Sequence, residues 1–192
     1  MDVTDSSTTR SPAATRLLGR LVEDRAAIDA PAGALAPLAA LAKGRGTWRR
    51  VVTGQVVGHA AHPFLTDLPI GFWTSASLLD VAGGPGAAGA ARRLVAAGLA
   101  SAPAAVLTGL AEYDGLGVRQ RRVAAVHASL NAASLVLYAA SWAVRPRRRG
   151  LGVGLALGGL SVSGASAYLG GHLAIGEKVG TSSSTATGPT PS

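Results

Sequence analysis

The distribution of charge along the chain is the feature that most constrains its fold. Charged residues make up 15% of the sequence, against about 25% in a typical soluble domain. Most of them lie before residue 51, in short arginine-rich runs, or near the end of the chain, and long tracts between them are almost free of charge. An apolar tract of about 20 residues is long enough for a helix to cross the hydrocarbon core of a bilayer. The pattern therefore predicts an integral membrane protein.

Four tracts have the length of a membrane span, within a transmembrane domain of residues 45–180. They cover about residues 64–83, 94–111, 123–144 and 151–175. The first is the weakest of the four, because Asp67 and Asp80 lie near its ends. We interpret Asp80 only as a helix terminus. An even number of spans places both termini on one side of the membrane, so we expect an all-α, four-helix membrane bundle.

The flanks of this domain have a different composition. Residues 1–44 form an expected N-terminal tail, in which apolar and charged residues alternate between positions 17 and 28 with the spacing of a short amphipathic helix. We expect Pro31 and Pro37 to break the chain after that helix. Residues 181–192 are rich in Ser, Thr and Pro and are expected to be disordered. No internal repeat is evident in the sequence.

The chain is strongly basic, with a formal net charge of +8. The basic residues are scattered over loops at both expected membrane faces, so anionic lipid headgroups are the expected partners and nucleic acid is not. The two faces carry similar numbers of arginines, so the positive-inside rule does not determine which face is cytoplasmic. The simplest arrangement leaves the long charged tail, and hence both termini, in the cytoplasm. The chain contains no cysteine, which excludes disulfides, iron–sulfur ligation and thiol catalysis.

All four histidines lie within or beside the apolar tracts. His59 and His62 precede the first expected span, His127 lies about 6 Å inside the third, and His172 lies at the far end of the fourth. Because the first and third spans begin on the face where the second and fourth end, the topology brings all four imidazoles to one membrane face. Imidazole is the commonest metal and haem ligand, and polar groups at membrane depth are commonly functional. The histidines therefore indicate a binding site.

Other polar residues are expected at the same face: Asp67, Glu112, Asp114 and Asn131. Asn131 follows His127 by four residues, so the two share a helix face and the amide could orient a ligand held by the imidazole. We place Asp67 and Asp114 with Asn131 in an outer shell around the histidines. The other interpretation is that interfacial histidines and acids reach for water or cap helix ends. Both interpretations stay open.

The residues around the first two histidines resemble a known family signature. The run 58–71, GHAAHPFLTDLPIG, resembles that of the bacterial predicted-membrane-protein family called domain of unknown function 2231 (DUF2231), whose usual form is Gly-His-Pro-x-His-Pro followed by Pro-Ile-Gly. Residues 108–110, His127 with Asn131, and residues 169–173 support the resemblance, which covers about residues 45–180. It implies a four-helix membrane domain without an established activity, often fused in actinobacteria to a Rieske iron–sulfur domain.

The chain departs from the family pattern at three places. Ala60 replaces the usual proline of the first motif, Glu112-Tyr113 stand where Asp-Trp is common, and the usual Gly-Val-Gly-Val ending is degraded at residues 176–180. We expect no Rieske domain here, because the sequence has no cysteine to bind its cluster. A redox partner of the Rieske type would therefore be a separate chain.

Two functional hypotheses follow. In the first, His127, together with His172, His59 or His62, ligates haem b or a divalent metal for electron transfer. His127 is the strongest candidate because it lies inside a span, and His172 is next because the glycines before it allow a close approach. In the second, the protein is a non-redox structural or partner-binding component of the bacterial inner membrane, with homo-oligomerisation possible in either case. The sequence has no catalytic motif, so we expect no enzyme activity of the chain by itself.

Overall fold

The computed structural model describes residue 17 and residues 19–173, and these residues form helices with no strand. The expected all-α class is therefore confirmed for this part of the chain. The C-terminal tail expected to be disordered and the degraded motif at 176–180 lie outside the described residues. The elements are a π-helical turn η1 (Gly19–Glu23), two 3-10 turns, η2 (Ala26–Ile28) and η3 (Pro85–Ala87), and the helices α2 (Asp29–Lys43), α3 (Gly46–Val52), α4 (Ala61–Ala82), α5 (Ala88–Tyr113), α6 (Val118–Val144) and α7 (Arg149–Gly171).

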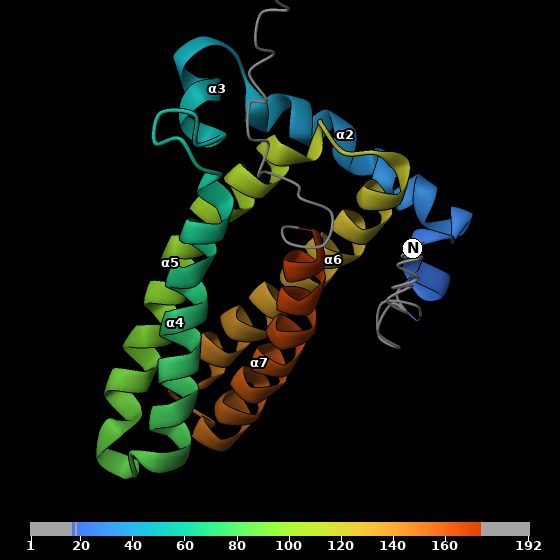
Figure 1. The fold of residues 1–192 in the computed structure, drawn as a ribbon. Coiled ribbons are helices and arrows are strands. Elements are labelled where there is room, and N and C mark those ends of the chain that lie inside the picture. The colour runs from blue at the N-terminus through green and yellow to red at the C-terminus, as the bar shows by residue number, and fades with distance from the viewer. Residues whose placement is uncertain (1–16, 18, 174–192) are drawn as a thin grey trace, which may run out of the picture.

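The four long helices form two antiparallel hairpins, α4–α5 and α6–α7 (Figure 1). Short connections join the helices of each hairpin at one end of the molecule. The hairpins contact each other through α5 with α6 and through α4 with α7. As a result, α4 and α6 begin at the end of the molecule where α5 and α7 finish (Figure 1).

The helices extend beyond the apolar tracts that predicted them. Helix α6 begins at Val118 rather than near residue 123, so it includes the arginines of the preceding loop. Its start is capped by Gln120, whose Oε1 accepts a hydrogen bond of 2.8 Å from the backbone N–H of Gly117. Arginine is a good helix former, so the first turn of the helix can include the arginines that follow the cap. The arginines at positions 119, 121 and 122 therefore do not mark the end of the helix.

Three of these elements are long and apolar enough to cross a membrane: Pro85–Tyr113, Val118–Val144 and Arg149–Gly171. Among the described residues α4 does not meet the same criterion, although it is 22 residues long. Its two aspartates, its histidine and its four hydroxyl residues lower its mean hydropathy. The sequence had already marked this tract as the weakest of the four.

The N-terminal region differs from the sequence expectation. The described residues of the segment expected to be amphipathic lie mainly in the turns η1 and η2, and the longer helix α2 follows where Pro31 and Pro37 were expected to break the chain. That expectation was wrong. Pro31 lies in the first turn of α2, where its missing N–H would have had no helical acceptor. Pro37 removes one interior hydrogen bond, and the surrounding alanines, the best helix formers, offset that loss.

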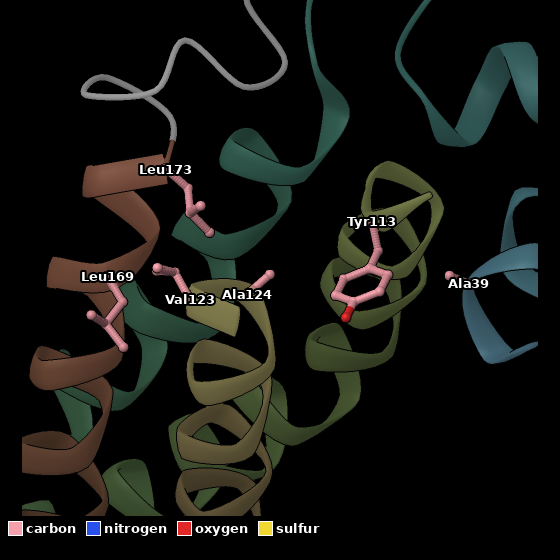
Figure 2. Packing of buried hydrophobic residues seen from close by; sticks show 6 residues of the cluster. All are labelled: Ala39, Tyr113, Val123, Ala124, Leu169 and Leu173. Carbon is pink, nitrogen blue, oxygen red and sulfur yellow. The ribbon is translucent and has the colours of Figure 1, made fainter. Parts of the chain in front are cut away.

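Helix α2 lies across the end of the hairpins where α4 and α6 begin (Figure 1). A cluster of buried apolar side chains holds it there. Figure 2 shows the members of this cluster: Ala39, Tyr113, Val123, Ala124, Leu169 and Leu173. The Tyr113 hydroxyl donates a hydrogen bond of 2.6 Å to the backbone carbonyl of Ala32. The N-terminal region is therefore packed against this end of the helices.

Candidate functional site

Two histidines meet between the hairpins, at the end covered by α2. The rings of His62, on α4, and His127, on α6, are half-buried and stand edge to face, with centroids 6.2 Å apart and planes at 90°. Each ring is also bonded to the other helix of its own hairpin. Nδ1 of His62 lies 2.9 Å from the carbonyl oxygen of Ala105 on α5, and Nδ1 of His127 lies 2.8 Å from that of Ser166 on α7. We call this arrangement the histidine pair.

The hydrogen bonds of His127 define its tautomer. A carbonyl oxygen only accepts, so Nδ1 carries the proton and Nε2 is the acceptor. The Asn131 amide donates to that Nε2 at 3.0 Å. The buried Ser166 hydroxyl lies 2.9 Å from both Nδ1 of His127 and Oδ1 of Asn131, to which it donates. His127 is therefore held as a neutral imidazole with a hydrogen-bond partner on each ring nitrogen.

The same reasoning applies to His62. Its Nδ1–H donates to the Ala105 carbonyl, and the Thr108 hydroxyl lies 3.5 Å from that nitrogen. Its Nε2 is then the unprotonated nitrogen, with a lone pair available. The Glu112 carboxylate accepts from the His62 backbone N–H, and within the described part of the chain its buried Oε1 has no hydrogen-bond partner. The end of α5 thus adds a carboxylate next to the histidine pair.

Glycines make room for both rings. A Cβ added to Gly109 would lie 2.8 Å from Cε1 of His62, and one added to Gly170 would lie 3.0 Å from Cε1 of His127. Contacts this short would force the rings to move. Each imidazole therefore packs directly on the backbone of the neighbouring helix, which accounts for the glycine at each position.

The other two histidines are engaged elsewhere. His59 is exposed between α3 and α4, with Nδ1 3.2 Å from the carbonyl oxygen of Val57. Nε2 of His172 lies 2.9 Å from Oε1 of Glu23 in the N-terminal turn. Within residues 17 and 19–173, no group of three or more His, Asp or Glu side chains is placed to hold a metal ion. The expected four-histidine cluster is therefore reduced to a pair, because α2 and the N-terminal turn, which the sequence did not place, occupy this end and engage His172.

The two expected outer-shell carboxylates point to other partners or to the surface. Asp114 forms an ion pair of 2.7 Å with Lys43 at the end of α2, and Asp67 is exposed on α4. The Lys43 side chain, by its hydrogen bond and its charge, lowers the pKa of Asp114. Asn131 is the one expected outer-shell residue that the structure places against a histidine of the pair.

A buried ion pair at the opposite end of the hairpins was missed by sequence reasoning. Asp80, at the end of α4, has a side chain that is 0% exposed, and Arg145, after α6, is 3% exposed. The guanidinium donates two hydrogen bonds to the carboxylate, of 2.9 and 2.6 Å. The sequence does contain a hint of this pair. Asp80 lies near the end of the first apolar tract, at the membrane face where the arginine-rich loop 145–149 is expected.

A third pair lies between these two. Trp73 of α4 stacks on Tyr138 of α6, with ring centroids 4.1 Å apart and planes at 12°. In all three pairs the residue on α6, or directly after it, follows its partner on α4 by 65 positions: His62 with His127, Trp73 with Tyr138, and Asp80 with Arg145. The helices α4 and α6 thus run parallel in a constant register.

The glycines follow the same register. Gly98 lies under Trp73 and Gly159 under Tyr138, each eleven residues before the glycine that lies under the histidine of the same hairpin. The two hairpins are therefore structural repeats of one pattern, in which a histidine and an aromatic residue of the first helix pack on glycines of the second. No repeat was evident in the sequence, and the structure corrects that reading.

The comparisons with known proteins agree with this architecture at the level of family. A family model described as predicted membrane protein (DUF2231) matches residues 58–183, which include both hairpins and all four histidines. No curated protein and no solved structure matches the chain.

Proposed function

Because the chain belongs to the DUF2231 family of predicted membrane proteins, we propose that it is a non-redox membrane component in which each histidine of the pair holds the two helices of its own hairpin together and the two rings pack against each other between the hairpins. The observation that carries this proposal is the hydrogen bonding of the two rings. Each Nδ1–H is used by a carbonyl of its own hairpin, and Nε2 of His127 is used by Asn131. Hydrogen bonds of this kind hold helices together in lipid.

We further propose that α4 is a fourth membrane span. Helix α4 keeps register with α6 from the histidine pair to the Asp80–Arg145 ion pair, a distance of 18 residues or about 27 Å of helix. Helix α6 is itself long and apolar enough to cross a membrane. A helix that matches it residue for residue over this length lies at the same depth. The carboxylate of Asp80 is compatible with that depth because Arg145 pairs with it.

Ligation of haem b or a divalent metal by His62 and His127 is the second candidate, and one observation favours it. A histidine that ligates a metal usually donates its other N–H to a carbonyl or carboxylate, and both rings of the pair donate Nδ1–H to a carbonyl. Against it, Nε2 of His127 already accepts from Asn131, and among the described residues no three His, Asp or Glu side chains are arranged to hold a metal ion together. A metal would require Asn131 to release this nitrogen.

One experiment distinguishes the two candidates. The full chain is purified in detergent from haem-supplied bacterial cells, and the Soret absorbance, metal content and unfolding transition are measured for wild type, His127→Ala and Ser129→Ala. Ser129 is an exposed residue on the same helix, whose hydroxyl bonds only to the Ala125 carbonyl, and it serves as the matched control.

The structural proposal expects wild-type protein without stoichiometric haem or metal, and a clear loss of stability in His127→Ala but not in Ser129→Ala. A Soret band in wild type that disappears in His127→Ala would replace the proposal with the redox candidate. Wild-type stability of His127→Ala in the absence of cofactor would contradict both.

A further inference from the structure

Arginines gather at the end of the molecule opposite the histidine pair. Six of them belong to the two connections and the adjoining helix ends: Arg92, Arg93, Arg145, Arg147, Arg148 and Arg149. Asp80 is the only acidic residue between positions 68 and 111, and none lies between positions 115 and 173. Arg145 is paired with this aspartate, and Arg149 lies 3.8 Å from it. This end of the molecule therefore has a large excess of positive charge.

The end covered by α2 is different in this respect. Acidic side chains there pair with basic ones in three ion pairs, Asp24 with Arg119, Asp29 with Arg122 and Asp114 with Lys43, and Glu23 is hydrogen-bonded to His172. The two ends therefore differ in the ratio of acidic to basic side chains more than in the number of arginines. The α2 end also has basic side chains outside these pairs, among them Arg45, Arg49 and Arg50, so an anion is attracted to both ends and more strongly to the arginine-rich end, where the excess of positive charge is larger.

The arginine-rich end is also hollowed. Two adjoining cavities of about 260 and 400 Å³ lie there and share Gly89 and Arg92 in their walls. Arg145, Pro146 and Arg149 line one of them, and Arg93, Ala96 and Trp142 line the other. The cavities thus form a groove between the start of α5 and the connection from α6 to α7. We call it the arginine groove.

Arg92 is fixed in the middle of this groove. Its guanidinium lies 4.6 Å above the ring of Trp142, and its Nε donates a hydrogen bond of 3.4 Å to the Trp142 carbonyl. A guanidinium that is already held in place loses less conformational freedom when it binds an anion, and its planar fork matches phosphate oxygens. Tryptophan is enriched at the level of lipid headgroups. The indole therefore places the groove at the depth of the phosphates.

We propose that the arginine groove binds the phosphate of an acidic phospholipid. Arg92, Arg93 and Arg149 supply the positive charge, and Ala96 and Trp142 continue the groove toward the apolar surface, where the acyl chains of the same lipid lie. A zwitterionic lipid presents the same phosphate together with an ammonium group, which the surrounding arginines repel. The groove therefore selects net-negative headgroups over neutral ones.

The test measures lipid retention by the full chain. Purified protein is equilibrated with mixed micelles containing equal amounts of phosphatidylglycerol and phosphatidylcholine, and the lipids that stay bound are counted by native mass spectrometry. The variants are Arg93→Gln and Arg92→Gln/Arg93→Gln, and the matched control is Arg49→Gln/Arg50→Gln, which removes two exposed arginines at the other end. A parallel sample contains inorganic phosphate as competitor.

Wild type is expected to retain phosphatidylglycerol in preference to phosphatidylcholine, and each groove arginine removed should lower its affinity by roughly fivefold, while the control behaves as wild type. Inorganic phosphate should displace little lipid, because it lacks the acyl chains; complete displacement would assign the groove to free phosphate instead. Equal retention of the two lipids, or an unchanged preference in the double variant, would overturn the proposal. Because Arg93 is exposed, its single variant decides the question if the double variant does not fold.

Discussion

Asp80 and Arg145 meet through two parallel hydrogen bonds of 2.9 and 2.6 Å in a site that excludes solvent from both side chains. A third donor of Arg145, Nε, bonds to the hydroxyl of Ser141, which donates in turn to the Gly152 carbonyl at 2.6 Å. The ion pair thus links α4 to the start of α7. The ion pair connects the hairpins at one end, and the histidine pair lies between them at the other end.

Removing one partner of this ion pair should be strongly destabilising. We expect Asp80→Ala to lower the free energy of unfolding by about 3–5 kcal/mol, because it leaves the Arg145 charge buried without a counter-charge. The double variant Asp80→Ala/Arg145→Met should be more stable than Asp80→Ala, since it removes both charges. Unfolding in detergent with increasing denaturant gives the comparison. A double variant less stable than either single variant would show that the pair is not energetically coupled in this way.

The glycines under the aromatic stack provide a second prediction. A Cβ on Gly98 would collide with the indole of Trp73, whereas a Cβ on Gly154 meets nothing within 4 Å. We expect Gly98→Ala to cost about 1–3 kcal/mol by overpacking. Gly154→Ala should be neutral or stabilising, because alanine is the better helix former. Thermal unfolding of the two variants side by side tests this, and equal midpoints would contradict the packing described for Trp73.

The coupling between the two histidines can be measured directly. Because His62 and His127 touch across the hairpins, the effects of His62→Ala and His127→Ala should not add. A double-mutant cycle is expected to give an interaction energy of about 0.5–3 kcal/mol, the range for residues in contact. His59→Ala combined with His127→Ala is the matched control, because His59 is exposed and bonds to Val57. Strict additivity of the first pair would contradict the role proposed for it.

Much of this architecture was predictable from the sequence, for a simple reason. Membrane helices are recognisable in a sequence by their length and by the absence of charge. Short connections make consecutive helices antiparallel, which determines which helix ends lie at the same face of the membrane. The end at which His62 and His127 lie follows from this, and the contact between His127 and Asn131 follows from their spacing of four residues. Local periodicity and topology were sufficient for these features.

The remaining features depend on contacts between distant segments. The engagement of His172 by Glu23 required the position of the N-terminal turn, which no periodicity specifies. The repeat between the hairpins lies in the spacing and packing of the residues and not in their identity. Trp73 corresponds to Tyr138, and Asp80 corresponds to Arg145. The spacing between contacting residues of the two helices also differs by four residues, 25 from Trp73 to Gly98 and 21 from Tyr138 to Gly159, so the second helices correspond at a different offset from the first. A comparison of residue types at one fixed offset misses such a repeat.

Acid should weaken the attachment of α2. The hydrogen bond from Lys43, assisted by its charge, holds the pKa of Asp114 below its usual value of 3.8, and Arg122 does the same for Asp29. A lowered pKa in the folded state stabilises the fold above the ordinary pKa, and this contribution is lost as the pH falls below about 4 toward the folded-state value. The stability difference between wild type and Asp114→Asn should therefore be present at neutral pH and shrink under acid. Thermal unfolding midpoints of wild type and Asp114→Asn, measured at neutral pH and below pH 4, give this difference. A stability difference that grows in acid would contradict the ion pair between Asp114 and Lys43.

The transmembrane topology is the last prediction. The chain contains no cysteine, so single cysteines introduced as Val57→Cys, Ala88→Cys and Gly117→Cys are unique labelling sites. Position 88 lies at the connection of the first hairpin, whereas positions 57 and 117 lie before α4 and before α6, at the opposite end. In cells, a membrane-impermeant thiol reagent should label position 88 from one side only, and positions 57 and 117 from the other.

Each outcome of that labelling addresses a different helix. Positions 88 and 117 are separated by α5, which is long and apolar enough to cross a membrane, so labelling of both from the same side would contradict the crossing of α5. Positions 57 and 88 are separated by α4, and labelling of these two from the same side would contradict the proposed fourth span while leaving the other three intact. Labelling of 57 with 117 is expected, because α4 and α6 run parallel in one register from the histidine pair to the buried ion pair.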